Sequence, residues 1–219
     1  MSVRQTTAYI PSLEAVRKSA DRLAPVVHRT HFTYHQRLSE RYECEVFVKR
    51  EDLQRVRSYK LRGAYNRISQ LDPEEAKRGI VCASAGNHAQ GVALSCQLLG
   101  IPGVIYMPVP TPSQKIEQVR MFGQSQVEVR LEGDSFDDSY HAALQESERS
   151  NRPFIHPFDD LKVIEGQATV GLEILEQADE DLDFLFLPVG GGGLAAGVSS
   201  VFRKASPDTR IIGVEPAGA

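Results

Sequence analysis

The sequence contains a run of four glycines, Gly190 to Gly193, whose chemistry is that of an anion site. An apolar run at residues 182–188, typical of a buried strand, precedes the glycines, and residues 194–204 have the apolar spacing of a helix. Glycines leave backbone N–H groups unobstructed and permit positive φ angles, so such a loop before a helix binds phosphate. The spacing is not that of an ATP P-loop, and a plain flexible turn would carry a large entropic cost. We therefore predict a phosphate site at residues 190–193.

A single lysine, Lys60, opens a predicted helix at residues 61–71. A cation at a helix N-terminus opposes the helix dipole and gains nothing from it. A surface lysine is the ordinary interpretation. The functional one is a lysine that forms a Schiff base, with a pKa lowered by burial and by nearby positive potential.

A third loop, at residues 84–88, follows a predicted strand and precedes a predicted helix. Its small residues and unobstructed N–H groups suit a carboxylate bound at a helix start. Asn87 alone would be read as a helix cap. His88 is a candidate base, although core or capping histidines are commoner.

These loops belong to a chain in which short β-branched runs alternate with helix-period segments, which predicts an α/β fold with parallel sheets covered by helices. In such sheets ligands bind beyond the carboxyl ends of the strands. Thr111-Pro112 predicts a capped helix start, and Gly100 and Gly123 predict left-handed helix ends. The expected strands are 46–49, 80–83, 103–107, 126–129, 154–156, 184–188 and 210–214, and the expected helices are 12–23, 61–71, 88–99, 112–122, 136–147, 163–177 and 194–204.

Composition excludes several classes of function. A net charge of −4 gives no reason to expect nucleic-acid or membrane-surface binding, and the basic residues between 49 and 62, interrupted by acidic ones, read as a mixed, solvated surface. The longest apolar stretch, 184–198, is broken by Pro188 and the glycines, so no membrane span is expected. Three cysteines without a C-x-x-C pair, together with a polar N-terminus, predict a cytoplasmic protein without disulfides. The sequence ends just after a predicted strand, and we expect a truncated chain.

Together the three loops carry a resemblance. The stretches 58–64, 84–88 and 190–194 look like the cofactor-lysine, substrate-carboxylate and phosphate motifs of the fold-type-II (tryptophan synthase β-like) pyridoxal-phosphate enzymes, in their threonine and serine dehydratase branch. Residues 49–52 and 156–160 also resemble that branch, and the resemblance runs from about residue 29 to residue 219. It implies two open parallel-sheet domains, with the large one at 1–50 and 152–219 and the small one at 51–151.

The resemblance also implies roles for individual residues. Lys60 would bind pyridoxal 5′-phosphate covalently and move the α-proton, Tyr59 would pack beside the pyridine ring, and Asn87 would hydrogen-bond the 3′-oxygen. A monovalent or divalent cation would bind at Glu215 and Ala219. The phosphate would be held by Gly190, Gly191, Gly192, Gly193 and Leu194, and the substrate carboxylate by the loop of Ser84, Ala85, Gly86, Asn87 and His88.

The activity implied is dehydration of L-threonine to 2-oxobutanoate and ammonia, a step of isoleucine biosynthesis, by a homo-oligomer (dimer or tetramer) that takes a small amino-acid substrate. Two departures from the branch matter. The residue that faces the pyridine nitrogen lies beyond position 219, so the isolated fragment is expected to be inactive. Ala85 stands where racemases have a serine, which favours dehydration.

Other functions remain open on the sequence alone. A serine dehydratase or serine racemase of the same branch is the nearest alternative, and a β-replacement enzyme such as cysteine synthase is disfavoured by residues 58–64. A dinucleotide-binding oxidoreductase would use the glycine loop with Glu215 as the acidic partner. A non-catalytic scaffold is the last alternative.

Overall fold

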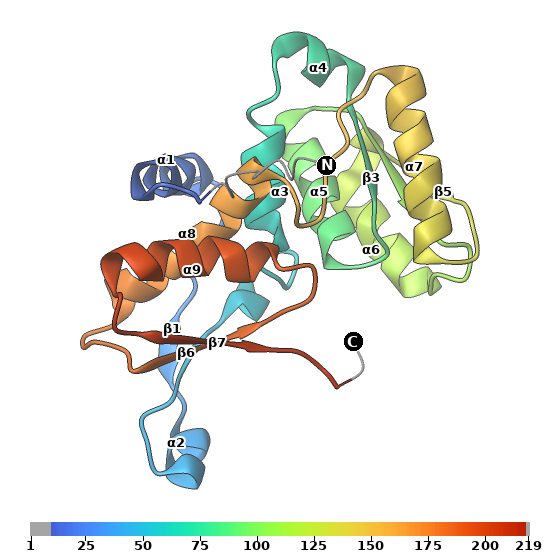
Figure 1. Ribbon diagram of the computed structural model, residues 1–219. Helices are drawn as coiled ribbons and strands as arrows, with labels where there is room; N and C mark the ends of the chain where they lie inside the picture. Colours follow the sequence, from blue (N-terminus) through green and yellow to red (C-terminus); the bar gives the residue numbers. More distant parts are fainter. Residues whose placement is uncertain (1–9, 218–219) are drawn as a thin grey trace, which may run out of the picture.

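The structure is a computed structural model that describes residues 10–217 (Figure 1). Three sheets lie in this part of the chain, one antiparallel and two parallel. The antiparallel sheet pairs β1 (Phe32–Tyr34) with β2 (Phe47–Lys49), one parallel sheet has the order β3 (Ile80–Ala83), β4 (Gly103–Met107), β5 (Val127–Leu131), and the other pairs β6 (Phe184–Pro188) with β7 (Arg210–Val214). The predicted α/β fold with parallel sheets is confirmed.

The three-stranded sheet is covered by helices on both faces. Alternate residues of β3 and β4, such as Cys82 and Ile105, pack against the apolar faces of α5 and α6. The residues between them, such as Val81 and Val104, pack against α7. This period of two is what a parallel strand buried on both faces requires. The helices of this unit are α4 (Pro73–Arg78), α5 (Asn87–Leu99), α6 (Ser113–Gly123) and α7 (Phe136–Ser150), with a 3-10 turn, η2, at Gln124–Gln126.

The second parallel sheet is covered on one face only. Leu185 and Leu187 of β6 point into a cluster with helices α8 and α9, while Phe184 and Phe186 on the other face are exposed. The prediction of a buried strand at 182–188 was therefore wrong for one face. Helices α8 (Leu161–Gln177) and α9 (Gly193–Ala205) cover this sheet, and α1 (Leu13–Leu23) packs on them. Helix α3 (Lys60–Ile68) lies between α8 and α5, and α2 (Gln36–Tyr42) lies apart from the other helices in Figure 1.

Close backbone contacts hold α8 against both α3 and α9. A Cβ atom on Gly166 of α8 would lie 2.6 Å from the carbonyl oxygen of Arg62 in α3. A Cβ atom on Gly197 of α9 would lie 2.6 Å from the carbonyl oxygen of Ile164 in α8. The backbones of the three helices are therefore in direct contact at these two positions.

Some local predictions failed. Gly123 has φ −83°, and its neighbour Gln124 takes the positive φ; Gly123 is instead a packing position, because a Cβ there would meet Val127 at 2.5 Å. Pro112, not Thr111, is the N-cap of α6, and no side chain caps it. The segment 154–156 forms only a single parallel bridge, from Phe154 to Val81. Gly100 does end α5 in the left-handed conformation, as predicted.

In residues 10–217 no helix combines the length and the apolar character that crossing a bilayer requires.

Candidate active site

Lys60 is the first residue of α3 and lies half-buried. Its Nζ donates a hydrogen bond of 2.7 Å to the carbonyl oxygen of Pro157 and lies 5.6 Å from the ring centroid of Tyr59. Burial lowers the pKa of this amine. In residues 10–217 no carboxylate forms an ion pair with Lys60, and the Pro157 carbonyl is the acceptor that the amine uses there. A buried amine of lowered pKa is suited to act as a nucleophile and a base.

Two glycines bring other helices against the start of α3. A Cβ atom on Gly91 of α5 would lie 3.1 Å from the carbonyl oxygen of Lys60. A Cβ atom on Gly63 would lie 2.4 Å from the side chain of Gln167 in α8. The backbone at Lys60 is thus fixed between α5 and α8, which leaves only its side chain free to move.

A buried ionic cluster fixes α3 further. Arg62 is fully buried, and its guanidinium forms bidentate hydrogen bonds to Glu51 (2.8 and 2.8 Å) and to Glu173 (2.6 and 3.0 Å). Lys49 donates to the same Glu173 and to the carbonyl of Thr30. The prediction of a solvated basic surface between residues 49 and 62 was therefore wrong for Lys49 and Arg62, which join η1 (Glu51–Leu53), α3 and α8.

The glycine loop lies between the end of β6 and the start of α9, as predicted. Gly192 caps α9 with φ +82°, a conformation that favours glycine. Gly190 and Gly191 are exposed, while Gly193 and Leu194 are buried. The first N–H groups of a helix have no acceptor within it, and they lie at the positive end of its dipole. The loop is therefore built to receive an anion.

The loop rests on Phe158. A Cβ atom on Gly191 would lie 2.1 Å from the Phe158 ring, and one on Gly193 would lie 2.9 Å from the Phe158 carbonyl oxygen. Tyr59, which precedes the lysine, packs against the cluster that contains Leu187 and Leu194 on either side of the glycines. Lys60 bonds to Pro157, and the glycines rest on Phe158. The lysine amine and the glycine loop are therefore in contact with two consecutive residues.

This contact makes a prediction for the glycines. We expect Gly191→Ala to weaken the binding of a phosphate-bearing ligand by roughly ten- to hundredfold, because overpacking of about 1–3 kcal/mol must displace the Phe158 ring. Ala196→Ser is the control, since Ala196 is an exposed residue of α9 beyond the glycine loop. Titration of each variant with the ligand measures both; equal weakening by the two variants would contradict the packing argument.

The loop at residues 84–88, which contains Asn87, lies at the carboxyl end of β3 and the start of α5. Asn87 is exposed and is the first helical residue, while Gly86 occupies the cap position without a side-chain bond. Ser84 is half-buried, and its hydroxyl accepts a hydrogen bond of 3.2 Å from the N–H of Gly86. Ala85 is also half-buried and packs against the apolar cluster below α5. The first turn of α5 therefore offers N–H groups and an exposed amide beside the helix that carries Lys60.

His88 differs from the rest of this loop because it is buried. Its Nε2 donates a 3.0 Å hydrogen bond to the carbonyl oxygen of Ile155, while its Nδ1 has no partner in residues 10–217. Burial lowers the pKa of His88 to about 3. The imidazole is therefore neutral and ties α5 to the segment that leads to Pro157, and its predicted contact with substrate stays a prediction.

The predicted cation site is less defined. Glu215 follows β7 and is exposed, and Ala219 lies outside the described residues. Within residues 10–217 no three His, Cys, Asp or Glu side chains gather in a way that could hold a metal ion. The cation at Glu215 and Ala219 stays a prediction.

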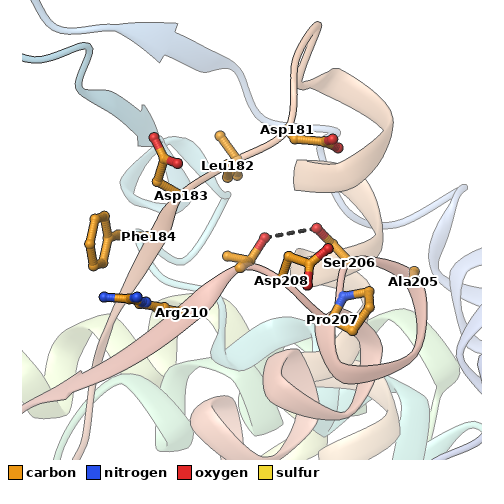
Figure 2. Close-up of a pocket in the computed structure, with 10 residues that line it drawn as sticks. Asp181, Leu182, Asp183, Phe184, Ala205, Ser206, Pro207, Asp208 and Arg210 are labelled. Carbon is orange, nitrogen blue, oxygen red and sulfur yellow. Dashed lines mark hydrogen bonds between the residues drawn. The ribbon is translucent and has the colours of Figure 1, made fainter.

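An open hollow of about 620 Å³ lies at the opposite end of the β6–β7 sheet (Figure 2). Asp183 and Arg210, at the amino ends of the two strands, line it together with Asp208. The glycine loop follows the carboxyl end of β6, so this hollow contains none of the predicted site residues.

Sequence reasoning did not include Pro157 and Phe158 among the site residues. The stretch 156–160 resembled the family but was assigned no role. Every residue has a backbone carbonyl, so the residue type does not reveal which carbonyl accepts a hydrogen bond from the lysine. A proline followed by an aromatic residue just before a predicted helix was the only available signal.

Comparisons with known proteins agree with this geometry. The sequence model of the family described as "Pyridoxal-phosphate dependent enzyme" matches residues 23–219. The chain is 54% identical over 197 residues to the biosynthetic L-threonine dehydratase of Halalkalibacterium halodurans, covering 90% of this chain and 48% of that protein. The corresponding protein of Bacillus subtilis is 54% identical over 202 residues, covering 92% and 48%. The chain spans about half the length of the curated relatives it matches.

Solved structures show the same likeness. The processed form of threonine deaminase isoform 2 from Solanum lycopersicum superposes with a TM-score of 0.87 at 43% identity, covering 100% of this chain and 60% of that one. Maize serine racemase superposes with a TM-score of 0.90 at 35% identity, covering 96% of this chain and 63% of that one.

Proposed function

The chain belongs to the family of pyridoxal-phosphate-dependent enzymes, and we propose that the complete protein removes ammonia from L-threonine to give 2-oxobutanoate. One observation carries the proposal: the Lys60 amine and the glycine loop contact the consecutive residues Pro157 and Phe158. The names and the 54% identity of the bacterial threonine dehydratases support the choice of substrate. A role in isoleucine biosynthesis is part of the same proposal, since those relatives are named biosynthetic.

The residues fit pyridoxal 5′-phosphate by their chemistry. The cofactor needs an amine for its aldehyde and an anion site for its phosphate, and Lys60 and residues 190–194 supply these groups on one shared support. A Cβ atom on Gly190 or Gly192 would meet nothing within 4 Å, so the glycine loop is open on its outer side. When bound, the cofactor acts as an electron sink that makes the substrate α-proton acidic.

The chain's own residues would bind, orient and transfer protons. Lys60 would carry the cofactor at rest and then hold the α-proton on its Nζ, a role that its lowered pKa favours. Tyr59 would pack beside the cofactor ring, and Asn87 would donate to the cofactor's 3′-oxygen. The N–H groups at the start of α5 would hold the substrate carboxylate, and those at the start of α9 the phosphate.

The test is formation of 2-oxo acid from L-threonine and from L-serine by the complete protein, with pyridoxal phosphate supplied. Faster turnover of threonine supports the proposal. Turnover of serine alone would move the function to serine dehydration. Absence of turnover, with absorbance from lysine-bound cofactor present, would keep the cofactor and discard both substrates.

The second candidate is a serine dehydratase or serine racemase, which the likeness to maize serine racemase favours. Ala85 argues against racemisation, because it places a methyl group where the racemases of the branch carry a hydroxyl.

This gives a prediction for Ala85→Ser. The new hydroxyl should supply a proton donor on the second face of the substrate, so slow formation of D-serine from L-serine is expected in the complete protein. Chiral analysis after long incubation measures it. The exposed Ala205→Ser is the control, and a result without D-serine in either variant would count against the role assigned to position 85.

Further proposals concern organisation. We propose a small domain at 51–151 and a large one at 1–50 and 152–219, supported by separate apolar clusters under the β3–β5 and β6–β7 sheets. We also propose a cytoplasmic homo-oligomer, either a dimer or a tetramer. Three free cysteines support a reducing compartment, and the exposed rings of Tyr34 and Phe186 support an interface. Light scattering on the complete protein tests the oligomer.

A further inference from the structure

His156 shapes the turn on which both ends of the proposed site rest. Its Nδ1 accepts hydrogen bonds from the backbone N–H of Asp159 (2.7 Å) and of Phe158 (3.3 Å). A ring nitrogen that accepts carries no proton, so in the neutral ring the proton sits on Nε2. The neutral imidazole thus closes a turn over residues 156–159.

Aromatic rings hold the imidazole from several directions. Phe158 meets it edge-on with ring centroids 4.6 Å apart, and Phe154 and Tyr140 of α7 each lie at 6.1 Å. Edge-to-face geometry at these separations is favourable and directional. The ring orientation that lets Nδ1 face the two N–H groups is therefore set by packing.

The turn presents two groups to the site. The Pro157 carbonyl accepts from Lys60 Nζ, and the Phe158 ring and carbonyl support Gly191 and Gly193. We propose that His156 is a positioning residue that, through this turn, sets the place of the Lys60 amine relative to the glycine loop. The inference rests on the proposed function only in taking these two groups as the ends of the cofactor site.

The role requires the neutral imidazole and depends on pH. Burial lowers the pKa of His156, Asp159 and Asp160 oppose that effect, and Lys60 adds to it; the net shift is downward. The neighbouring His88, which also interacts electrostatically with His156, is itself neutral. Protonation would replace an acceptor by a donor that faces two N–H groups. The turn is therefore formed above the pKa of His156 and lost as the pH falls through it.

The test uses the complete protein in its cofactor-free form. An amine-selective acetylating reagent labels Lys60, and mass spectrometry measures the rate as a function of pH. The variants are His156→Leu, which removes the acceptor, and His156→Asn, whose amide oxygen can accept in the same place but does not titrate. The control is His141→Leu, an exposed histidine on α7. Uptake of pyridoxal phosphate by each variant is the second measurement.

We expect Lys60 of the His156→Leu variant to be labelled roughly tenfold faster, and the variant to bind pyridoxal phosphate roughly tenfold more weakly, the effect of losing the one hydrogen bond from Lys60 to Pro157. In the parent protein, loss of the turn should raise the labelling rate, corrected for protonation of the amine, as the pH falls through the pKa of His156. His156→Asn should match the parent near neutral pH and lack this rise. Labelling of His156→Leu at the parent rate would overturn the proposal. The proposal would also be overturned if the labelling rate below neutral pH changed in His156→Asn as it does in the parent. This comparison decides the matter if the leucine variant does not fold. If the parent takes up no pyridoxal phosphate, the proposed function fails, while labelling still decides the role of His156.

Discussion

Lys60→Ala in the complete protein is expected to abolish 2-oxo-acid formation and the visible absorbance of lysine-bound pyridoxal phosphate. The loss should exceed the roughly 10²–10⁴-fold that proton transfer alone contributes, because the variant lacks both the covalent anchor and the base. The fold should persist, since in the described residues the side chain makes one hydrogen bond, to Pro157, and is only half-buried. Absorbance, turnover and thermal unfolding on the same sample measure all three.

The control for this variant is Lys115→Ala, an exposed lysine on α6, which should leave turnover unchanged. Near-parent turnover by Lys60→Ala, without an added amine, would remove the lysine from its proposed role. A variant that fails to fold would instead show that the Lys60 amine also stabilises the fold. Thermal unfolding separates loss of turnover in a folded variant from loss of turnover through unfolding.

Arg62→Met should lower the free energy of unfolding of the complete protein by about 3–5 kcal/mol, the cost of breaking a buried ion pair by removing one partner. Methionine fills much of the volume but leaves Glu51 and Glu173 with one cation, Lys49, between them. Chemical denaturation of parent and variant measures the difference.

The exposed pair Lys77–Glu74 supplies the control, since Lys77→Met should change the free energy of unfolding by less than about 1 kcal/mol. The pH dependence gives a second check. Burial raises the pKa of Glu51, but the hydrogen bonds and charge of Arg62 outweigh it, so the net shift is downward. The stabilisation is therefore complete above the ordinary pKa of a glutamate and is lost as the pH falls through the lowered one. Equal acid sensitivity of parent and Arg62→Met would contradict this account.

Much of the fold was predictable because its strands are apolar and bounded by clear turn residues. The strands at 80–83, 103–107, 184–188 and 210–214 begin and end where the pattern predicted. The pattern missed β1, α2 and α4. No residue of α4 is buried, so it has no apolar period, although Asp72 and Glu75 form a capping box that signals its start. Apolar periodicity does not detect short, exposed elements of this kind.

The candidate site was predictable where residue type decides its chemistry. Lys60 and the glycines stand where the sequence indicated, at the starts of α3 and α9. Burial of Arg62 was not predictable, because its partner Glu173 is 111 residues away. The same holds for the support at Pro157, which acts through a backbone carbonyl 97 residues from the lysine. Such contacts depend on tertiary packing, which local pattern does not contain.

The glycine contacts of α8 have a consequence for which molecules can bind. Gly166 and Gly197 bring the backbones of α3 and α9 against one helix, so the distance between the starts of α3 and α9 is set by backbone contact. A ligand held at Lys60 and at the proposed phosphate loop would therefore have to span a distance that varies only with the lysine side chain. Enlarging either glycine would alter that length and discriminate among phosphorylated aldehydes of different size, without placing any new atom in the site itself.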